Sequence, residues 1–227
     1  MPTGTLFVVA TPIGNLEDIT YRAARILAEA DYILCEDTRV TGVLLKHYGI
    51  ASKLKRYDAH ATHRFETQVC DDLRAGKRIA LVSDAGTPGI SDPGVHLVRA
   101  VREEVPEAKV VAVPGASSVS AAFSIAGIPG NQFTFLGFAP QKKGRQTFFA
   151  ELEHAEMSVI FLESTHRIMK MLESLVSVKL TKKITIAREM TKLYEEVVSG
   201  SAEELLAYFT EHPDHQKGEF VVIVHSE

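Results

Sequence analysis

The chain has 227 residues, 45% of them hydrophobic and 24% charged, a composition typical of a globular protein with a sizeable apolar core. Its formal net charge of -4 excludes a protein-wide basic field, so any polyanion must bind to a local patch. The two cysteines predict neither a disulfide framework nor a metal cluster. No apolar run is long enough to cross a bilayer and no signal-peptide pattern is present, so we expect a cytoplasmic protein that binds neither membrane nor metal.

Buried-strand patterns alternate with segments of helical spacing through the first half of the chain. Strands are expected at 5–10, 32–35, 53–57, 78–82 and 109–113, and helices at 21–30, 40–48, 60–75 and 95–105. This alternation predicts an α/β domain. His60 and His63 could share a face of the third helix and hold a metal ion. Because no cysteine or carboxylate cluster lies nearby, solvated histidines are the favoured interpretation.

A Gly/Pro loop at 114–118 interrupts this pattern, and we place the domain boundary there, between domains 1–114 and 115–227. The strand–helix alternation begins again after a helix of small residues. Helices are expected at 119–126, 146–155, 167–178 and 202–210, strands at 133–138, 158–162, 184–187, 194–198 and 219–224, and a turn at Ser199 and Gly200. The last two strands flank so few residues that the second domain is expected to have a mixed or antiparallel sheet.

The stretch 83–94, with the sequence SDAGTPGISDPG, joins an expected buried strand to an expected helix and is unusually long for such a connection. Glycines let a backbone come close to a ligand, and prolines hold a loop in one shape. Loops at the carboxyl ends of strands are where open α/β sheets bind ligands. We therefore favour a binding site over an ordinary connection in which Asp92 or Ser91 caps the next helix.

Further polar or Gly/Pro loops follow other strands, at 11–16, 36–39 and 114–118 in the first half. Glu36 to Arg39 could belong to a site at the sheet edge, or Asp37 could cap a helix and pair with Arg39 at the surface; both interpretations stay open. In the second half, the basic loop 141–145 is either a solvated loop or a phosphate contact.

Nucleophile-elbow, Walker-type and Gly-x-Gly-x-x-Gly patterns do not occur in the chain. The remaining arrangement is a cleft between two α/β halves, lined by Gly/Pro loops and a few charges. This arrangement suits an enzyme that binds a reactive cofactor and acts by positioning.

Several motifs closely resemble those of the ribosomal RNA small subunit methyltransferase I family, in the same order and over almost the whole chain. They are LFVVATPIGNL at 6–16, EDTR at 36–39, SDAGTP at 83–88, SDPG at 91–94, PGAS at 114–117, ESTHR at 163–167 and REMTK at 188–192. The resemblance implies the tetrapyrrole-methylase fold, with two α/β domains, the donor site in the cleft between them and a mixed second sheet. It also implies S-adenosylmethionine as methyl donor and usually a homodimer. The implied acceptor is a cytidine ribose 2′-hydroxyl in the decoding region of small-subunit rRNA, either naked or in the assembled subunit.

The same resemblance assigns donor contacts, made mainly by the backbone, to positions that match the family motifs. They are Pro12, Ile13, Asp84, Gly86, Thr87, Ala116, Ser117 and Ser118, completed from the second sheet by Leu162, Glu163 and Met190. For the transfer itself we expect in-line displacement at the sulfonium methyl by the ribose oxygen. Asp37 and Glu36 are the candidate bases, and Arg39 and Lys192 the candidate positioners of a phosphate or hydroxyl group.

Two other functions remain alternatives. One is a tetrapyrrole methylase on the same fold, since a small acidic substrate fits the net charge of -4 better than rRNA does. The other is a non-catalytic RNA- or nucleotide-binding module that uses the cleft as a sensor.

Overall fold

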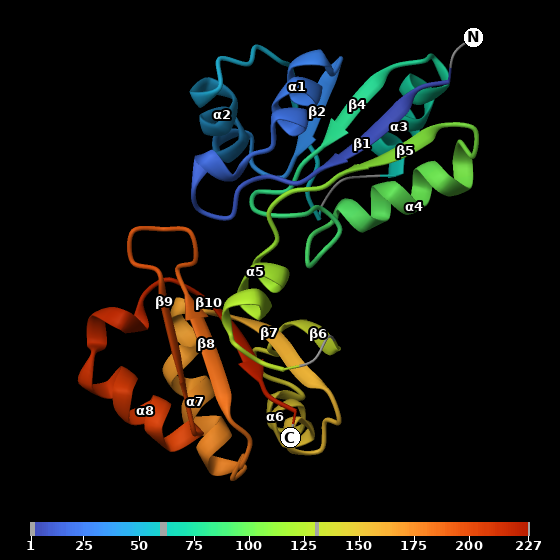
Figure 1. The fold of residues 1–227 in the computed structure, drawn as a ribbon. Helices are drawn as coiled ribbons and strands as arrows, with labels where there is room; N and C mark the ends of the chain where they lie inside the picture. The colour runs from blue at the N-terminus through green and yellow to red at the C-terminus, as the bar shows by residue number, and fades with distance from the viewer. Residues whose placement is uncertain (1–2, 60–62, 130–131, 227) are drawn as a thin grey trace. The chain divides into compact units, whose positions relative to one another are not determined.

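The computed structural model describes residues 3–59, 63–129 and 132–226, so the hypothesis for His60 lies outside the described residues. The chain forms two compact units, the first ending at Ser117 and the second beginning at Ser118 (Figure 1). Every strand and helix expected from the sequence is present in the described part of the chain, most of them with ends shifted by one or two residues.

The first unit contains a five-stranded sheet in the order β3-β2-β4-β1-β5, in which all neighbours are parallel. Its strands are β1 (Thr5–Val9), β2 (Tyr32–Cys35), β3 (Leu54–Arg56), β4 (Arg78–Leu81) and β5 (Lys109–Val113). Its helices are α1 (Tyr21–Glu29), α2 (Thr38–His47), α3 (His63–Arg74) and α4 (Gly94–Glu104), with a short 3-10 helix, η1 (Leu16–Asp18). In such a sheet the carboxyl ends of the strands, and the loops that follow them, lie at one edge.

Alternate residues of each strand divide between two cores because successive side chains point to opposite faces of a sheet. In β4, Ile79 and Leu81 pack in the core that contains residues of α3 and α4. Ala80 packs in the other core, with residues of α1 and α2. Helices therefore cover both faces of the parallel sheet, which accounts for the nearly continuous apolar runs that the strands show in sequence.

The second unit contains a mixed sheet in the order β6-β7-β10-β8-β9, with β6 and β7 parallel and the other neighbours antiparallel. Its strands are β6 (Phe133–Phe138), β7 (Ser158–Ser164), β8 (Ile184–Arg188), β9 (Glu196–Gly200) and β10 (Glu219–Val224). Its helices are α5 (Ser118–Ile125), α6 (Arg145–Glu153), α7 (Ile168–Ser177) and α8 (Ala202–Glu211), with 3-10 helices η2 (Thr165–Arg167) and η3 (Pro213–Gln216). The expectation of a mixed sheet is confirmed.

The turn expected at Ser199 and Gly200 is wrong, because both residues belong to β9 and pair with Thr185 and Ile184 of β8. The chain stays extended until Ser201, which caps α8: its hydroxyl accepts a hydrogen bond from the Glu204 backbone, and the Glu204 carboxylate accepts one from the Ser201 backbone. The capping residue, not the small Ser–Gly pair, ends the strand.

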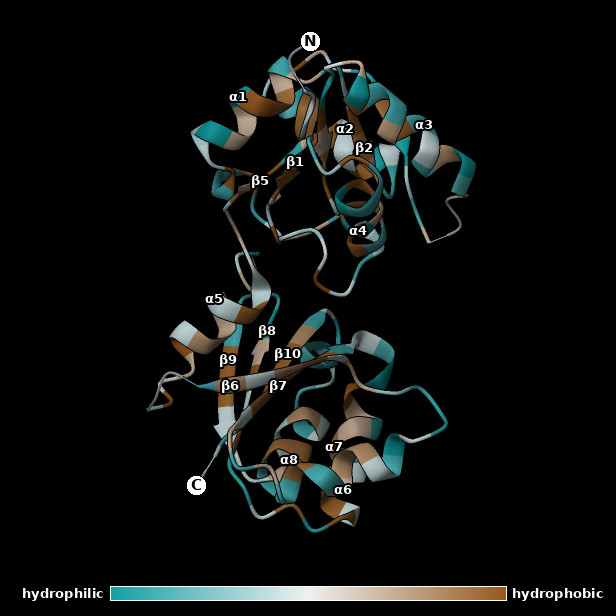
Figure 2. Cartoon of the chain, turned by 90° about the vertical axis from the view of Figure 1, so that its right-hand side faces the viewer, coloured by the Kyte–Doolittle hydropathy of each residue, from teal (hydrophilic) through white to brown (hydrophobic). Residues whose placement is uncertain are grey.

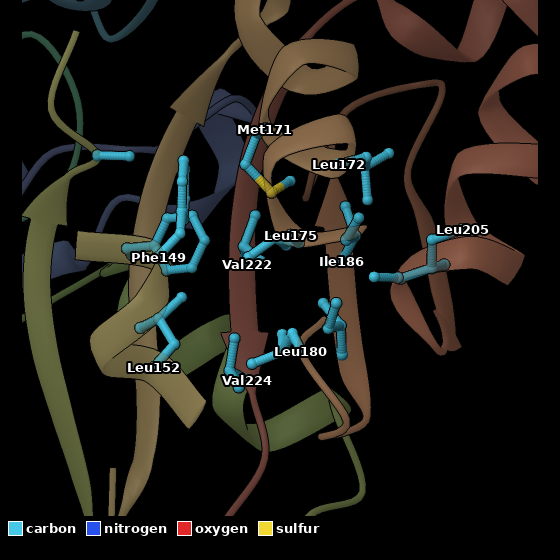
Figure 3. Close-up of a cluster of buried hydrophobic side chains, with 14 of the residues drawn as sticks. Phe149, Leu152, Met171, Leu172, Leu175, Leu180, Ile186, Leu205, Val222 and Val224 are labelled. Carbon is cyan, nitrogen blue, oxygen red and sulfur yellow. The ribbon is translucent and has the colours of Figure 1, made fainter. Parts of the chain in front are cut away.

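One face of the second sheet packs against α6, α7 and α8 through a large hydrophobic core (Figure 3). The other face packs against α5 through a smaller cluster that includes Ile160, Val221 and Ile223. Figure 2 shows α8 with hydrophobic and hydrophilic residues together, as expected for a helix that covers a sheet on one side only. Within the described residues, no helix is both long enough and apolar enough to cross a membrane.

The large core of the second unit predicts a strong dependence on Phe161, which is fully buried and contacts the rings of Phe148 and Phe149. Phe161→Ala should lower the free energy of unfolding by about 3–5 kcal/mol because it removes buried apolar surface and leaves a cavity. Urea denaturation measures this loss. Phe138→Ala is the matched control, since Phe138 is 54% exposed, and an equal loss in both variants would contradict the packing described.

Candidate active site

The loops after β1 and β4 are joined by a two-way backbone pairing between Thr11 and Gly86. The Thr11 N–H donates to the Gly86 carbonyl at 2.9 Å, and the Gly86 N–H donates to the Thr11 carbonyl at 3.1 Å. The buried Thr11 hydroxyl also donates to the Ser83 carbonyl at 3.1 Å. Gly86 has φ +80°, a conformation that side chains with a Cβ rarely adopt. The two strand ends are therefore held together at the edge of the sheet.

The loop after β5 is attached to the same cluster. The Thr87 hydroxyl donates to the Ala116 carbonyl at 3.2 Å. Gly115 packs so closely on Ala10, the residue after β1, that a Cβ there would lie 3.0 Å from the Cβ of Ala10. A Cβ on Gly86 would lie 3.3 Å from Ile13 Cγ2 and 3.7 Å from the Ala116 carbonyl oxygen. The structure thus brings together five of the expected donor-contact positions, which are Pro12, Ile13, Gly86, Thr87 and Ala116.

The rest of the 83–94 loop is organised by the carboxylate of Asp92. It accepts hydrogen bonds from the backbone N–H groups of Gly89, Ile90 and Gly94, the shortest at 2.7 Å. Ser91 has φ +67°, a left-handed conformation that costs free energy for a residue with a Cβ. Asp92 therefore shapes the loop itself in addition to binding the first residue of α4.

The charged residues after β2 join the cluster through Asp84, whose carboxylate accepts a hydrogen bond from the Asp37 N–H at 3.0 Å. The Asp37 carboxylate caps α2 by accepting from the Arg39 N–H at 2.8 Å, and it also pairs with the Arg39 guanidinium. Hydrogen bonds from Arg39 hold the pKa of Asp37 well below its usual range. The cap and the surface ion pair expected as one alternative are therefore both present.

Glu36 has a different environment from its neighbour. It is half-buried, and burial raises its pKa above the ordinary value, with the negative charge of Asp84 as a further cause. A carboxylate with a raised pKa takes up a proton more readily than one held by a guanidinium group. Glu36 is therefore the better candidate base of the two.

In the second unit, the side chain of Glu163 is fully buried between two arginines that come from different elements. Its Oε2 lies 3.1 Å from a terminal guanidinium nitrogen of Arg145, and its Oε1 lies 2.8 Å from Nε of Arg167. The neighbouring Leu162 is partly buried against the cluster under α5. The Glu163 carboxylate is thus engaged with the two arginines and is not free to contact a donor.

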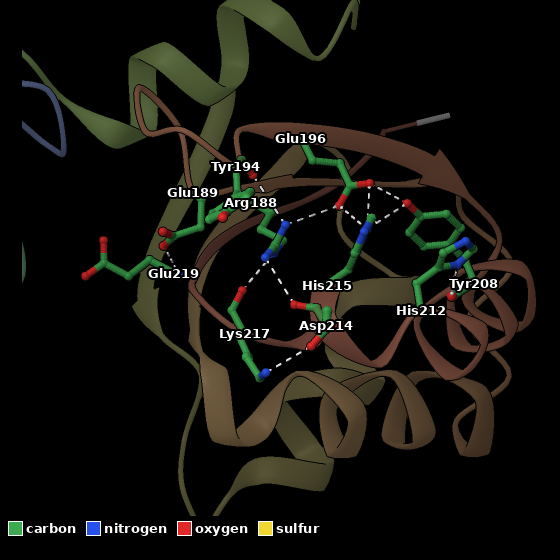
Figure 4. Close-up of polar contacts among 10 residues, drawn as sticks. All are labelled: Arg188, Glu189, Tyr194, Glu196, Tyr208, His212, Asp214, His215, Lys217 and Glu219. Atoms are coloured by element: carbon green, nitrogen blue, oxygen red, sulfur yellow. Dashed lines mark hydrogen bonds and ion pairs between the residues drawn. The ribbon is translucent and has the colours of Figure 1, made fainter.

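Arg188 at the end of β8 has a structural role that we did not predict from its sequence motif. Its buried guanidinium group donates to the carbonyl oxygens of Lys217 at 2.7 Å and of Tyr194 and Asp214 at 3.3 Å (Figure 4). These bonds tie the connection between β8 and β9 to the segment before β10. A charged residue at the end of a mostly apolar strand is the sequence signal for such a role, but it does not identify the partners.

Two expected site residues lie in that connection. Met190 is buried in the cluster under α5. The Lys192 ammonium group lies 2.9 Å from Oε1 of Glu189 and 3.0 Å from Oε2 of Glu219, so two carboxylates already surround its charge. Glu189 and Thr191 have positive φ angles of 48° and 66°, which marks the connection as a strained segment.

The remaining expected positions are Ser117 and Ser118. They lie at the division between the two units, with Ser118 as the first residue of α5. In the part of the chain that the structure describes, no group of three or more His, Cys, Asp or Glu residues is placed to hold a metal ion.

Comparison with known proteins extends this description. The chain matches the family described as Tetrapyrrole (Corrin/Porphyrin) Methylases over residues 5–206. It is 45% identical to the ribosomal RNA small subunit methyltransferase I of Halalkalibacterium halodurans, over 97% of this chain and 75% of that protein. It is 44% identical to the protein of the same name from Escherichia coli O157:H7, over 97% of this chain and 77% of that protein.

Two solved structures share the fold. The methyltransferase CobJ matches with a TM-score of 0.69 and 21% identity, over 99% of this chain and 95% of that chain. The cobalt precorrin-4 methyltransferase CbiF matches with a TM-score of 0.67 and 18% identity, over 97% of this chain and 94% of that chain.

The buried Glu163 pair predicts a large effect of charge removal. Glu163→Gln should lower the free energy of unfolding by about 3 kcal/mol because the guanidinium groups of Arg145 and Arg167 lose the carboxylate that they share. Urea denaturation of the purified protein measures the change. Glu151→Gln on the exposed side of α6 is the matched control, and a loss no larger than that of the control would contradict the role assigned to Glu163.

Proposed function

Because the chain belongs to the ribosomal RNA small subunit methyltransferase I family of the tetrapyrrole methylases, we propose that it methylates small-subunit rRNA. The acceptor is a cytidine ribose 2′-hydroxyl in the decoding region, and the donor is S-adenosylmethionine. The observation that carries the proposal is the high identity to rRNA methyltransferases over nearly the whole chain. The much lower identity to the precorrin enzyme supports only a shared fold.

The loop cluster of the first unit suits a donor that is held mainly by main-chain groups. Gly86 has no side chain and lies beside Ile13 and the carbonyl of Ala116, whose own side chain is small. Residues 114–116 are half-buried or exposed, so a ligand can approach this segment. Pro12, Asp84, Thr87, Ser117 and Ser118 are the further contacts that we propose, with Leu162, Glu163 and Met190 of the second unit. When bound, the donor supplies an activated methyl group.

The chemistry left to the protein is alignment of the acceptor and removal of its proton. The carboxylate of Glu36 would accept the proton of the ribose hydroxyl when that oxygen is methylated by the bound donor. A carboxylate is suited to this step when its pKa is raised toward the working pH. Asp37 is less suited because its pairing with Arg39 stabilises the ionised form.

Arg39 and Lys192 are proposed to position the acceptor. The Arg39 side chain is 89% exposed even though it pairs with Asp37, so its remaining N–H groups are available to a phosphate. Lys192 binds two carboxylates in this structure, and contact with a hydroxyl group would have to compete with them. From the family we also infer a homodimer that acts on rRNA, either naked or within the small subunit.

Incubation with tritiated S-adenosylmethionine and small ribosomal subunits from a strain lacking the enzyme tests the proposal. Label in the rRNA ribose supports it. Label that enters only an added tetrapyrrole would replace it with the tetrapyrrole alternative, and donor binding without transfer would replace it with a non-catalytic binding module.

The assignment of Glu36 predicts that Glu36→Gln lowers the rate of methyl transfer about 10²–10⁴-fold, the usual contribution of general base catalysis. The affinity for the donor should stay unchanged. Asp37→Asn is the matched control and should lower the rate much less, because asparagine can still cap α2. A near-normal rate for Glu36→Gln in a protein that binds the donor would remove Glu36 from this role.

The pH dependence gives a second readout of the same assignment. Burial raises the pKa of Glu36, so the wild-type rate should fall with decreasing pH at values above those of an ordinary glutamate. Glu36→Gln should lose this acid limb, whereas Asp37→Asn should keep it. An acid limb that persists in Glu36→Gln would show that another group accepts the proton.

A further inference from the structure

The second unit has a polar cavity of about 720 Å³. None of the expected donor-contact residues lines it, but Arg145 and Arg167, which bind Glu163, do. The cavity lies between the loop that precedes α6, the first turn of α6, and α7. Four cationic side chains line it, those of Lys142, Arg145, Arg167 and Lys170. The basic loop that the sequence left as either solvated or phosphate-binding therefore forms one wall of a cavity.

The charges around this cavity do not balance. The buried carboxylate of Glu163 is shared by two guanidinium groups, and Glu173 is the other acidic side chain beside the cavity. Four positive charges against these two negative charges leave a formal surplus of two. In a chain with a net charge of -4, such a surplus marks a local site for an anion.

The two lysines carry this surplus at the accessible part of the cavity. Lys142 and Lys170 are exposed, and among the described residues no carboxylate pairs with either ammonium group. They come from elements that are separated in sequence, the loop before α6 and the helix α7. A solvated charge run explains one lysine-rich loop, but it does not explain why a second element adds a cation to the same cavity.

The start of α6 adds backbone donors to this surface. Gly144 occupies the capping position with φ +81° and has no side chain to cap the helix. The Arg145 N–H donates to the Lys142 carbonyl at 3.3 Å. Gln146 and Thr147, both in the first turn of α6, line the cavity. N–H groups in the first turn of a helix favour phosphate oxygens, and the Gln146 and Thr147 N–H groups are the candidate donors here.

We propose that this cavity binds the sugar–phosphate backbone of the RNA acceptor, an inference that rests on the proposed function. The lysines contact phosphate oxygens as mobile point charges. Arg145 and Arg167 are held in place by Glu163 and supply positive charge at fixed positions in the cavity. The volume exceeds that of one phosphate group and admits the adjoining ribose. Backbone contacts of this kind position an RNA without reading its sequence.

The double variant Lys142→Gln with Lys170→Gln tests the proposal without disturbing the arginines that bind Glu163. Binding of a fluorescein-labelled transcript of the decoding region is measured by anisotropy over a series of KCl concentrations. The affinity should fall about tenfold at low salt, and the slope of log K against log salt should lose about 1.4 in magnitude, as expected for two contacts to single-stranded RNA.

Lys183→Gln is the matched control because Lys183 is exposed and precedes β8 at the opposite end of the sheet, whereas the cavity lies near the end of β7. It should bind the transcript like the wild type. All variants should bind S-adenosylmethionine with unchanged affinity, which shows that they are folded. A double variant that keeps the wild-type affinity and salt slope would overturn the inference.

Failure of this inference is distinguishable from failure of the proposed function. Methyl transfer by the wild-type protein to small ribosomal subunits is measured separately from binding. A wild type that transfers methyl groups, together with a double variant that binds RNA normally, overturns only the role of the cavity. A wild type that transfers none to rRNA overturns the proposed function itself.

Discussion

The backbone pairing of Thr11 with Gly86 is the interaction on which the candidate site of the first unit depends. A parallel sheet places the ends of its strands at one edge, but it does not by itself hold the following loops together. The pairing joins the loops after β1 and β4, Thr87 adds the loop after β5, and Asp84 adds the loop after β2. Each of these bonds has a main-chain group on at least one side, and the side chains that take part are small, which suits a cofactor bound through the backbone.

The second unit relies on buried arginines in a corresponding way. Arg145 and Arg167 share Glu163, and Arg188 donates to three carbonyl groups in segments that the sheet does not hold. A buried charge is tolerated only when its hydrogen bonds are satisfied. Two of these arginines, Arg167 and Arg188, lie in motifs typical of the family. These motifs therefore stabilise the structure of the second unit in addition to any role in the site. The same arrangement leaves positive charge beside the cavity at the start of α6.

Most of the fold could be predicted from the sequence because apolar periodicity reports burial residue by residue. The α/β class and the mixed second sheet were both expected and are present. The placement of β9 was wrong because a small Ser–Gly pair suggested a turn, while the cap at Ser201 decides where the strand ends. Sequence also left Glu36 and Asp37 equivalent, although only Asp37 is held by a guanidinium group.

The sequence by itself determined the helices and strands, the loops that follow the strands and the family to which the chain belongs. Each of these follows from local patterns and motifs. Only the tertiary structure decided which charged groups meet. Asp84 binds the backbone of Asp37 across 47 positions, and Glu163 binds Arg145 across 18. The order of strands in a sheet and the packing of helices on it decide which residues meet, and local sequence patterns do not reveal that order. For the same reason a basic loop became one wall of a cavity only when α7 was placed against it.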